Sequence, residues 1–245
     1  MKRVVAIIQA RMGSTRLPGK VLKTLKGRSV LAHVVDRVRQ SKYVNDIVIA
    51  TTNLQKDNVL IEEIKKMGIK YFRGSEWDVL SRYYYAAKEN NADIIVRITS
   101  DCPLIDSKVV DDIIKFYLDN NYELVTNAGM DLSKRTYPRG LDVEVFSFNV
   151  LEKVYNNANR NYQREHVTPY IYENIDNIYY YLNKKDYSKY RWTLDTIEDF
   201  KLISRIYDEF YTGDHDFYLD EIIEFMNKNP EISKINEHIE QKKIK

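Results

Sequence analysis

The chain has 245 residues, of which 44% are hydrophobic, 30% charged and 12% aromatic, and its formal net charge is +2. A composition this apolar excludes a disordered chain, and the near-neutral charge gives no general reason to expect nucleic acid or an acidic membrane as a partner. The single cysteine, Cys102, excludes an internal disulfide bond and any metal site built from several cysteines.

No apolar run approaches the roughly 20 residues that span a bilayer. The N-terminus leads directly into a strand-like run, Val4 to Ile8, without the small-residue cleavage site of a signal peptide. We therefore expect a cytoplasmic protein that does not associate with membranes.

In the first half of the chain, short apolar runs alternate with amphipathic stretches. The runs predict strands at residues 4–8, 47–50, 71–72 and 94–98, and the stretches predict helices at 30–39, 59–67, 79–88 and 109–118. Strands that alternate with helices are typical of βαβ units. The sequence therefore predicts an α/β fold in which helices cover a parallel sheet.

Beyond Tyr122 the alternation is less regular. The pattern predicts strands at 123–126, 141–146, 178–182 and 191–194, and helices at 163–172 and 197–209. The tail from Phe217 to Lys245 is predicted to be helical and then charged, with Lys242, Lys243 and Lys245 at its end, and to fray in solvent. Because the chain contains no linker and no repeat, residues 1–245 are predicted to form a single domain.

The loop after the first predicted strand is rich in glycine and arginine, with the sequence QARMGSTRLPGK at residues 9–20. It is not an ATPase phosphate loop, because five residues separate Gly13 from Gly19 and Val21 follows Lys20 where a Ser or Thr would hold magnesium. Residues 1–35 nevertheless contain eight Lys or Arg and no acidic residue. We predict another kind of anion site, in which Arg11, Arg16 and Lys20 bind triphosphate oxygens.

Two aspartates follow predicted strands, Asp101 after 94–98 and Asp195 after 191–194. In an open parallel sheet, ligands bind beyond the carboxyl ends of the strands. Mg²⁺ prefers carboxylate oxygens and often uses one or two of them, with phosphates and water completing its shell. Two such carboxylates facing a basic loop predict a magnesium–triphosphate site.

Helix capping is the alternative role for these aspartates. Asp106 and Ser107 are better placed to cap the helix at 109–118, and Thr196 with Asp199 forms a capping-box pattern for the helix at 197–209. Cys102 has no motif histidine beside it, so we expect an inert core residue and not a nucleophile.

Three segments, QARMGSTRLPGK, TSDCPL and RWTLDTIEDF, together resemble the cytidylyltransferases that activate acidic sugars, the acylneuraminate and 3-deoxy-manno-octulosonate synthetases. The likeness is greatest to the spore-coat polysaccharide branch and covers roughly residues 1–210. It implies a doubly wound, mostly parallel, Rossmann-like sheet of the glycosyltransferase-A type, with a protruding dimerisation and acceptor segment around residues 130–182. It also implies a homodimer that transfers a nucleoside monophosphate, CMP from CTP, to a sugar or sugar-acid acceptor, with Mg²⁺ as cofactor and release of pyrophosphate.

The resemblance also implies a role for individual residues. Asp101 and Asp195 would hold Mg²⁺, and Arg11, Arg16, Lys20 and Asp101 would carry catalysis. The nucleotide would be bound by Ala10, Arg11, Gly13, Lys20, Thr51, Arg73 and Arg97. The acceptor would be bound by Asp142, Glu144, Glu165 and His166, of which His166 fits a packed helix position equally well.

The opening loop departs from that of the sialate synthetases, which carry Gly-Ser-Lys and then Lys-Asn where this chain has Gly13-Ser14-Thr15-Arg16 and Gly19-Lys20-Val21. The acceptor and the base therefore stay open. Two other functions are the alternatives. A glycosyltransferase would be expected to show an Asp-x-Asp motif, which residues 100–103 lack, and a non-catalytic nucleotide-binding module would not need both Asp101 and Asp195.

Overall fold

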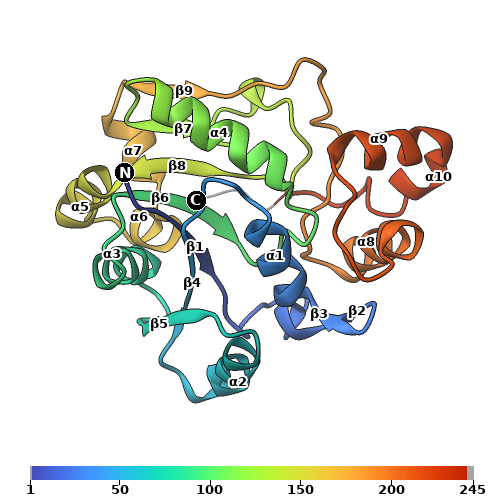
Figure 1. Ribbon diagram of the computed structural model, residues 1–245, viewed down its shortest axis with the longest axis horizontal. Helices are drawn as coiled ribbons and strands as arrows, with labels where there is room; N and C mark the ends of the chain where they lie inside the picture. The colour runs from blue at the N-terminus through green and yellow to red at the C-terminus, as the bar shows by residue number, and fades with distance from the viewer. Residues whose placement is uncertain (1, 242–245) are drawn as a thin grey trace.

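The computed structural model describes residues 2–241, and within them seven strands form one sheet in the order β5-β4-β1-β6-β8-β7-β9 (Figure 1). The strands are β1 (Val4–Gln9), β4 (Asp46–Thr52), β5 (Lys70–Gly74), β6 (Ile94–Thr99), β7 (Leu124–Thr126), β8 (Glu144–Ser147) and β9 (Ile178–Tyr180). β1, β4, β5 and β6 run parallel, whereas β8 is antiparallel to both β6 and β7. The predicted mostly parallel α/β sheet is confirmed. A separate two-stranded hairpin, β2 (Thr24–Leu25) and β3 (Arg28–Ser29), follows the opening loop.

Both faces of the sheet are covered because its central strands are apolar on both sides. Val4, Ala6 and Ile8 of β1 share a core with helices α1 (Val30–Arg39), α2 (Asn58–Lys66) and α4 (Ser107–Asp119). Val5 and Ile7 share the opposite core with α3 (Val79–Glu89), α5 (Phe148–Asn157) and α7 (Pro169–Asn174). The sheet is therefore the middle of three layers, and its strand ends form the edge on which the polar loops meet.

Several predicted elements differ from the structure. No strand forms at 191–194, where Arg191 makes an isolated bridge to Arg139. The predicted helix at 163–172 is two helices, α6 (Asn161–His166) and α7, because Val167 has a φ of 72° and Pro169 begins the second helix. The strand predicted from residue 141 begins at Glu144, and helix α5 was not predicted.

The stretch 130–182 contributes largely to the main fold. It supplies β8 and β9 to the sheet and packs α5 and α7 on one of its faces. Most of it is therefore not a protrusion. Its use in dimerisation stays a prediction.

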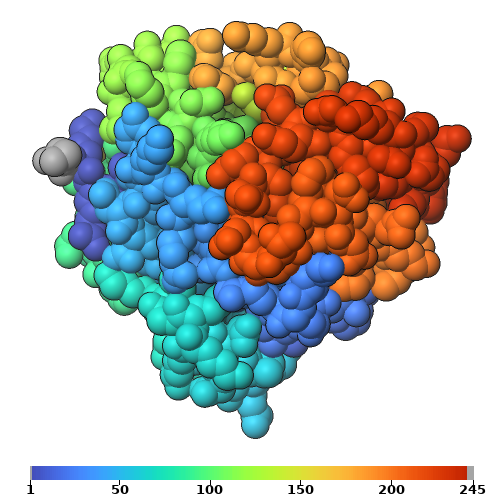
Figure 2. Space-filling view, turned by 45° about the vertical axis from the view of Figure 1, so that its right-hand side comes forward, coloured from blue at the N-terminus to red at the C-terminus, as the bar shows by residue number. Residues whose placement is uncertain are grey.

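The C-terminal segment comprises α8 (Ile197–Phe210), α9 (Leu219–Lys228) and α10 (Pro230–Ser233). The prediction that the tail frays is wrong for residues 217–241, since Phe217, Ile222 and Ile232 are buried and Arg37 Nη2 donates to the Phe217 carbonyl at 2.7 Å. In Figure 2 this orange-to-red segment packs against the blue N-terminal part of the chain. Lys242, Lys243 and Lys245 lie outside the described residues. Among residues 2–241, no helix is both long and apolar enough to cross a membrane.

Candidate active site

The opening loop folds back on itself at the carboxyl end of β1. The Met12 carbonyl accepts hydrogen bonds from the backbone amides of Ser14 at 2.9 Å and Gly19 at 3.3 Å. Gly19 has a left-handed φ of 68°, which suits glycine, and it precedes the short 3₁₀ helix η1 (Lys20–Leu22). This turn directs Lys20 back toward the sheet edge.

A buried carboxylate anchors the loop from the side of β4. Asp57 is fully buried, and its Oδ1 accepts from the Met12 backbone amide at 2.7 Å, while its Oδ2 accepts from the Thr52 hydroxyl. Sequence reasoning missed Asp57, since a lone aspartate before a helix resembles an ordinary cap. The structure identifies it as the residue that fixes the position of the opening loop.

Lys20 lies at the meeting point of three distant segments. Its Nζ is 2.8 Å from Asp101 Oδ2 and 2.8 Å from Asp195 Oδ1, and it also donates to the Leu194 carbonyl at 2.7 Å. Its side chain is only 11% exposed. The structure thus brings together the lysine and the two aspartates that the sequence pointed to, and it does so around one ammonium group.

Electrostatics favour the charged forms of Lys20 and Asp101. Burial lowers the pKa of the Lys20 ammonium, but the charges of Asp101 and Asp195 outweigh burial and raise this pKa overall. Burial raises the pKa of Asp101, and the Lys20 charge with hydrogen bonds from Lys20 and Thr99 reverses this and lowers it overall. A buried cluster of this kind is stable because its opposite charges compensate one another.

Each aspartate is held by its own neighbours. The Thr99 hydroxyl donates to Asp101 Oδ1 at 2.6 Å, and the Asp101 carbonyl accepts from the Leu194 amide at 2.7 Å, which ties the two segments together. Asp195 Oδ2 accepts from Arg16 Nη2 at 2.8 Å and from Arg191 Nη2 at 2.9 Å. The predicted caps are confirmed separately, because Asp106 caps α4 and Thr196 with Asp199 forms a capping box on α8.

The remaining loop residues face a second acidic group. An added Cβ at Gly13 would lie 3.0 Å from Lys56 Nζ and 3.2 Å from Glu76 Oε1. Glu76 pairs with Lys56 at 2.6 Å and more loosely with Arg11 at 3.7 Å. Ala10 is buried, and its amide donates to the Ala50 carbonyl at 3.2 Å.

Three residues predicted to bind the nucleotide have internal roles in this conformation. Thr51 is fully buried, and its hydroxyl has no hydrogen-bond partner among residues 2–241. Arg73 donates to the carbonyls of Thr52 at 2.9 Å and Leu54 at 3.0 Å, so it braces the loop after β4. Arg97 forms an ion pair with Glu144, its register neighbour on β8. Their contact with a nucleotide stays a prediction.

The four residues predicted to bind the acceptor have different surroundings in this conformation. Glu144 is buried between Arg97 and the Tyr172 hydroxyl, and Asp142 forms a two-pronged ion pair with Arg135 at 2.6 and 3.3 Å. Glu165 is exposed on α6, and His166 is partly buried before the break at Val167. Cys102 is buried, and burial raises the pKa of its thiol, which suits the inert role predicted for it.

The donor set fits a hard divalent cation of the magnesium type. Two carboxylates, Asp101 and Asp195, already close around one positive charge, and oxygen is the donor that Mg²⁺ prefers. No group of three or more His, Cys, Asp or Glu residues that could hold a metal occurs within the described part of the chain. Mg²⁺ sites completed by substrate phosphates need no third carboxylate.

A protein family model and two known proteins resemble this chain, one of the proteins over nearly its whole length. A cytidylyltransferase family model matches residues 5–244. The spore coat polysaccharide biosynthesis protein SpsF of Bacillus subtilis is 34% identical over 243 residues, which cover 94% of this chain and 97% of that protein. A 3-deoxy-manno-octulosonate cytidylyltransferase of Solibacter usitatus is 33% identical over 112 residues, 45% of this chain and 43% of that protein.

Among solved structures, a cytidylyltransferase from Leptospira borgpetersenii is 39% identical. It superimposes with a TM-score of 0.89 and covers 99% of this chain and 100% of that one. Its fold agrees with the mostly parallel sheet described above. The family model and the two full-length matches lead to one conclusion: this chain belongs to the cytidylyltransferase family of nucleotidyltransferases.

Proposed function

We propose that the protein transfers CMP from CTP to a sugar-acid acceptor, releasing pyrophosphate, in the biosynthesis of a surface polysaccharide or glycan. The observation that carries the proposal is the Lys20 ammonium, 2.8 Å from each of two carboxylates at the sheet edge, with Arg16 on the second carboxylate. The resemblance to SpsF and to a 3-deoxy-manno-octulosonate cytidylyltransferase supports the nucleotide and the acceptor class.

In the proposed reaction, an acceptor oxygen attacks the α-phosphorus of CTP. The new bond joins that oxygen to the α-phosphorus, the bond to the α–β bridging oxygen breaks, and pyrophosphate leaves with the electron pair. The acceptor hydroxyl releases its proton to solvent. Arg16 and Lys20 would bind the phosphate oxygens, and Asp101 and Asp195 would hold Mg²⁺, which supplies Lewis-acid stabilisation of the phosphate charge. No covalent enzyme intermediate is required.

The surroundings of Arg139 support the proposal that the acceptor is an anion. Its backbone amide donates to the Tyr190 carbonyl at 3.0 Å, and its carbonyl accepts from the Trp192 amide at 2.7 Å. Arg139 therefore lies beside the segment that ends in Asp195. Its guanidinium has no ion pair or side-chain hydrogen bond within residues 2–241. Burial and the neighbouring Arg135 and Arg191 charges lower its pKa, although the Asp142 charge acts in the opposite direction. A partly buried cation with no directly bonded carboxylate favours a ligand that brings a carboxylate or phosphate.

The test is pyrophosphate release from the purified protein with Mg²⁺, each of CTP, UTP, GTP and ATP, and three acceptors. The acceptors are 3-deoxy-manno-octulosonate, N-acetylneuraminate and a sugar phosphate, and mass spectrometry identifies the product. We expect release with CTP and an acidic sugar, and its loss in the Asp101→Asn variant. Release with another triphosphate alone would refute the cytidyl assignment, and no release with any pairing would refute the activity. A homodimer and a cytoplasmic location stay predictions, the first checked by light scattering.

A further inference from the structure

Asp199 has more contacts than its capping role requires. It is fully buried, and its carboxylate accepts from Arg191 Nε at 2.9 Å and Nη2 at 3.1 Å, and from the backbone amides of Asp195 and Thr196, each at 2.9 Å. Burial raises the pKa of Asp199, but these hydrogen bonds and the Arg191 charge lower it overall. Of these contacts, the capping box explains only the hydrogen bond from the Thr196 amide. The other contacts fix the backbone of Asp195 and the guanidinium of Arg191.

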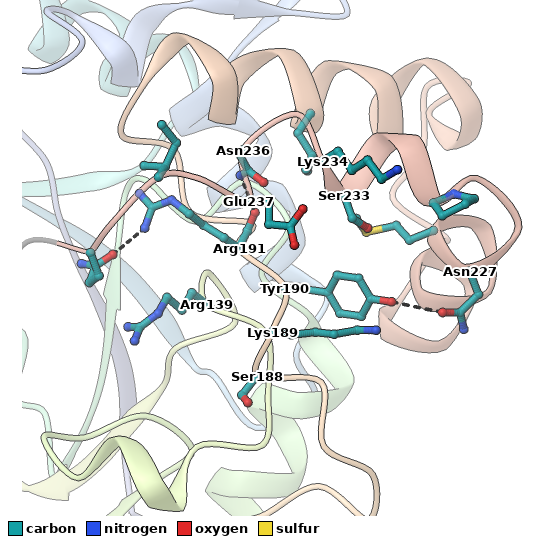
Figure 3. A pocket seen from close by; sticks show the side chains of 15 residues that line it. Arg139, Ser188, Lys189, Tyr190, Arg191, Asn227, Ser233, Lys234, Asn236 and Glu237 are labelled. Atoms are coloured by element: carbon teal, nitrogen blue, oxygen red, sulfur yellow. Dashed lines mark hydrogen bonds between the residues drawn. The ribbon is translucent and has the colours of Figure 1, made fainter.

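A further donor to Asp199 comes from the C-terminal segment. Asn236 is 2% exposed, and its Nδ2 donates to Asp199 Oδ1 at 2.8 Å and to the Arg191 carbonyl at 2.9 Å. Both partners are oxygens without a proton, so the amide nitrogen and not the amide oxygen must face them. Figure 3 shows Asn236 directed at Arg191 on the wall of a pocket of about 370 Å³.

These contacts lead to the carboxylate proposed to hold the metal. Arg191 Nη2 donates to Asp195 Oδ2 at 2.9 Å. The Arg191 side chain also donates to Asp199, and the Arg191 carbonyl accepts from Asn236. We propose that Asn236 is a positioning residue for Asp195, acting through Asp199 and Arg191. The segment that contributes Asn236 is then part of the active-site scaffold, although it lies beyond every motif recognised in the sequence.

Stability alone is a poor explanation for Asn236. It shares the pocket wall with the buried apolar side chains of Met226 and Leu202, and burying an amide there gains less free energy than burying a hydrocarbon of similar size. The capping box on α8 closes without it. A buried amide that contacts the supports of Asp195 is better explained by orientation of that carboxylate.

The inference rests on the proposed function, because Asp195 must bind the metal–nucleotide complex for its orientation to matter. The test is therefore a binding measurement, calorimetric titration of Mn²⁺ into protein with saturating CTP, with Mn²⁺ replacing Mg²⁺ for its tighter binding. Asn236→Leu keeps the approximate volume and removes both donated hydrogen bonds. We expect it to weaken Mn²⁺ binding about tenfold, as loss of groups that orient metal ligands typically does. Binding of CTP without metal should change less than twofold.

Ile222→Ala is the matched control. Ile222 lies on α9 in the same segment and is 1% exposed, so its truncation destabilises the segment without removing a polar contact. We expect this variant to lower the Tm while keeping the wild-type affinity for Mn²⁺. Asn236→Gln, which retains the amide donor, should recover part of the affinity, and Asn236→Ala is measured in the same way if the leucine variant does not fold.

Each outcome has one meaning. If both Asn236→Leu and Asn236→Ala bind Mn²⁺ as the control does, Asn236 has a structural role only and the inference is wrong. If the wild-type protein itself binds no metal with CTP, the proposed function fails first. A loss of affinity shared equally by Ile222→Ala would also overturn the positioning role, because general destabilisation would then explain it.

Discussion

The position of Lys20 predicts competition between its ammonium and a divalent cation. In this conformation, Nζ lies 2.8 Å from an oxygen of Asp101 and 2.8 Å from an oxygen of Asp195. Those are the oxygens that would bind Mg²⁺. We therefore expect Mg²⁺ alone to bind the wild-type protein weakly, and to bind Lys20→Met more tightly because this variant leaves the site without its cation.

The expected loss of stability in Lys20→Met without Mg²⁺ follows from the contacts that this variant loses. The carboxylates of Asp101 and Asp195 are 24% and 13% exposed, so they are only partly screened by solvent. Asp195 retains its ion pairs with Arg16 and Arg191. Within residues 2–241, the Thr99 hydroxyl is the only strong side-chain hydrogen-bond donor that Asp101 retains. Losing one partner of such a pair costs about 3 kcal/mol. For a domain of this size, that is a fall in Tm of about 6 to 12 °C.

The assay is thermal unfolding of both proteins with and without MgCl₂ at about 10 mM, which is about 10 times a Kd near 1 mM. At that ratio, binding adds about 1.4 kcal/mol to the stability of Lys20→Met and recovers about 3 to 6 °C. The wild-type protein should gain much less. Lys26→Met is the control, because it removes the same charge from an exposed position, 3.2 Å from Asp208. Equal responses to Mg²⁺ in the wild type and Lys20→Met would refute the reasoning.

Three further predictions concern the supports of the site. Gly140→Ala should destabilise the fold by several kcal/mol in chemical denaturation, since its Cβ would lie 2.5 Å from the backbone of Trp192. Gly213→Ala, also at positive φ but in open space, should cost about 1 to 2 kcal/mol. Asp57→Ala should weaken Mg²⁺–CTP binding about tenfold in calorimetry, because the opening loop loses its anchor. His33 and His215 are buried against each other, and burial lowers their pKa values to about 4 and about 3. Since the fold favours their neutral forms, their contribution to stability is complete above a pH of about 6.5 and falls as the pH drops toward about 4. At pH 5 the loss is on the order of 2 kcal/mol per histidine. His215→Gln should flatten this dependence of Tm on pH.

The strand-end cluster was predictable because its physical basis is local. Asp101 follows an apolar run that forms a central strand, and parallel strands place their carboxyl ends on one edge. The segment before Asp195 reaches the same edge without being a strand, held by the bond from the Leu194 amide to the Asp101 carbonyl. The wrong secondary structure at 191–194 therefore did not affect the predicted convergence.

The pairing of Arg97 with Glu144 was not predictable, although both residues were assigned to substrates. The pair depends on β8 entering the sheet antiparallel to β6, in the register that sets the two residues opposite each other. A sequence pattern gives the period of a strand but neither its neighbour nor its direction. The link from Asn236 to Asp199 was out of reach for a similar reason, since 37 residues separate them and a lone asparagine in a charged tail carries no signal.

The internal ion pairs of the opening loop explain why nucleotide and metal binding should be coupled. Arg11, Arg16 and Lys20 were predicted to bind phosphates, yet in this conformation each contacts a carboxylate: Arg11 that of Glu76, Arg16 that of Asp195, and Lys20 those of Asp101 and Asp195. A triphosphate that draws Arg16 and Lys20 to itself takes two cations away from these aspartates. The exposed negative charge must then be compensated, and a divalent cation shared with the phosphates compensates both partners at once. We therefore expect metal and triphosphate to bind together more tightly than either binds alone.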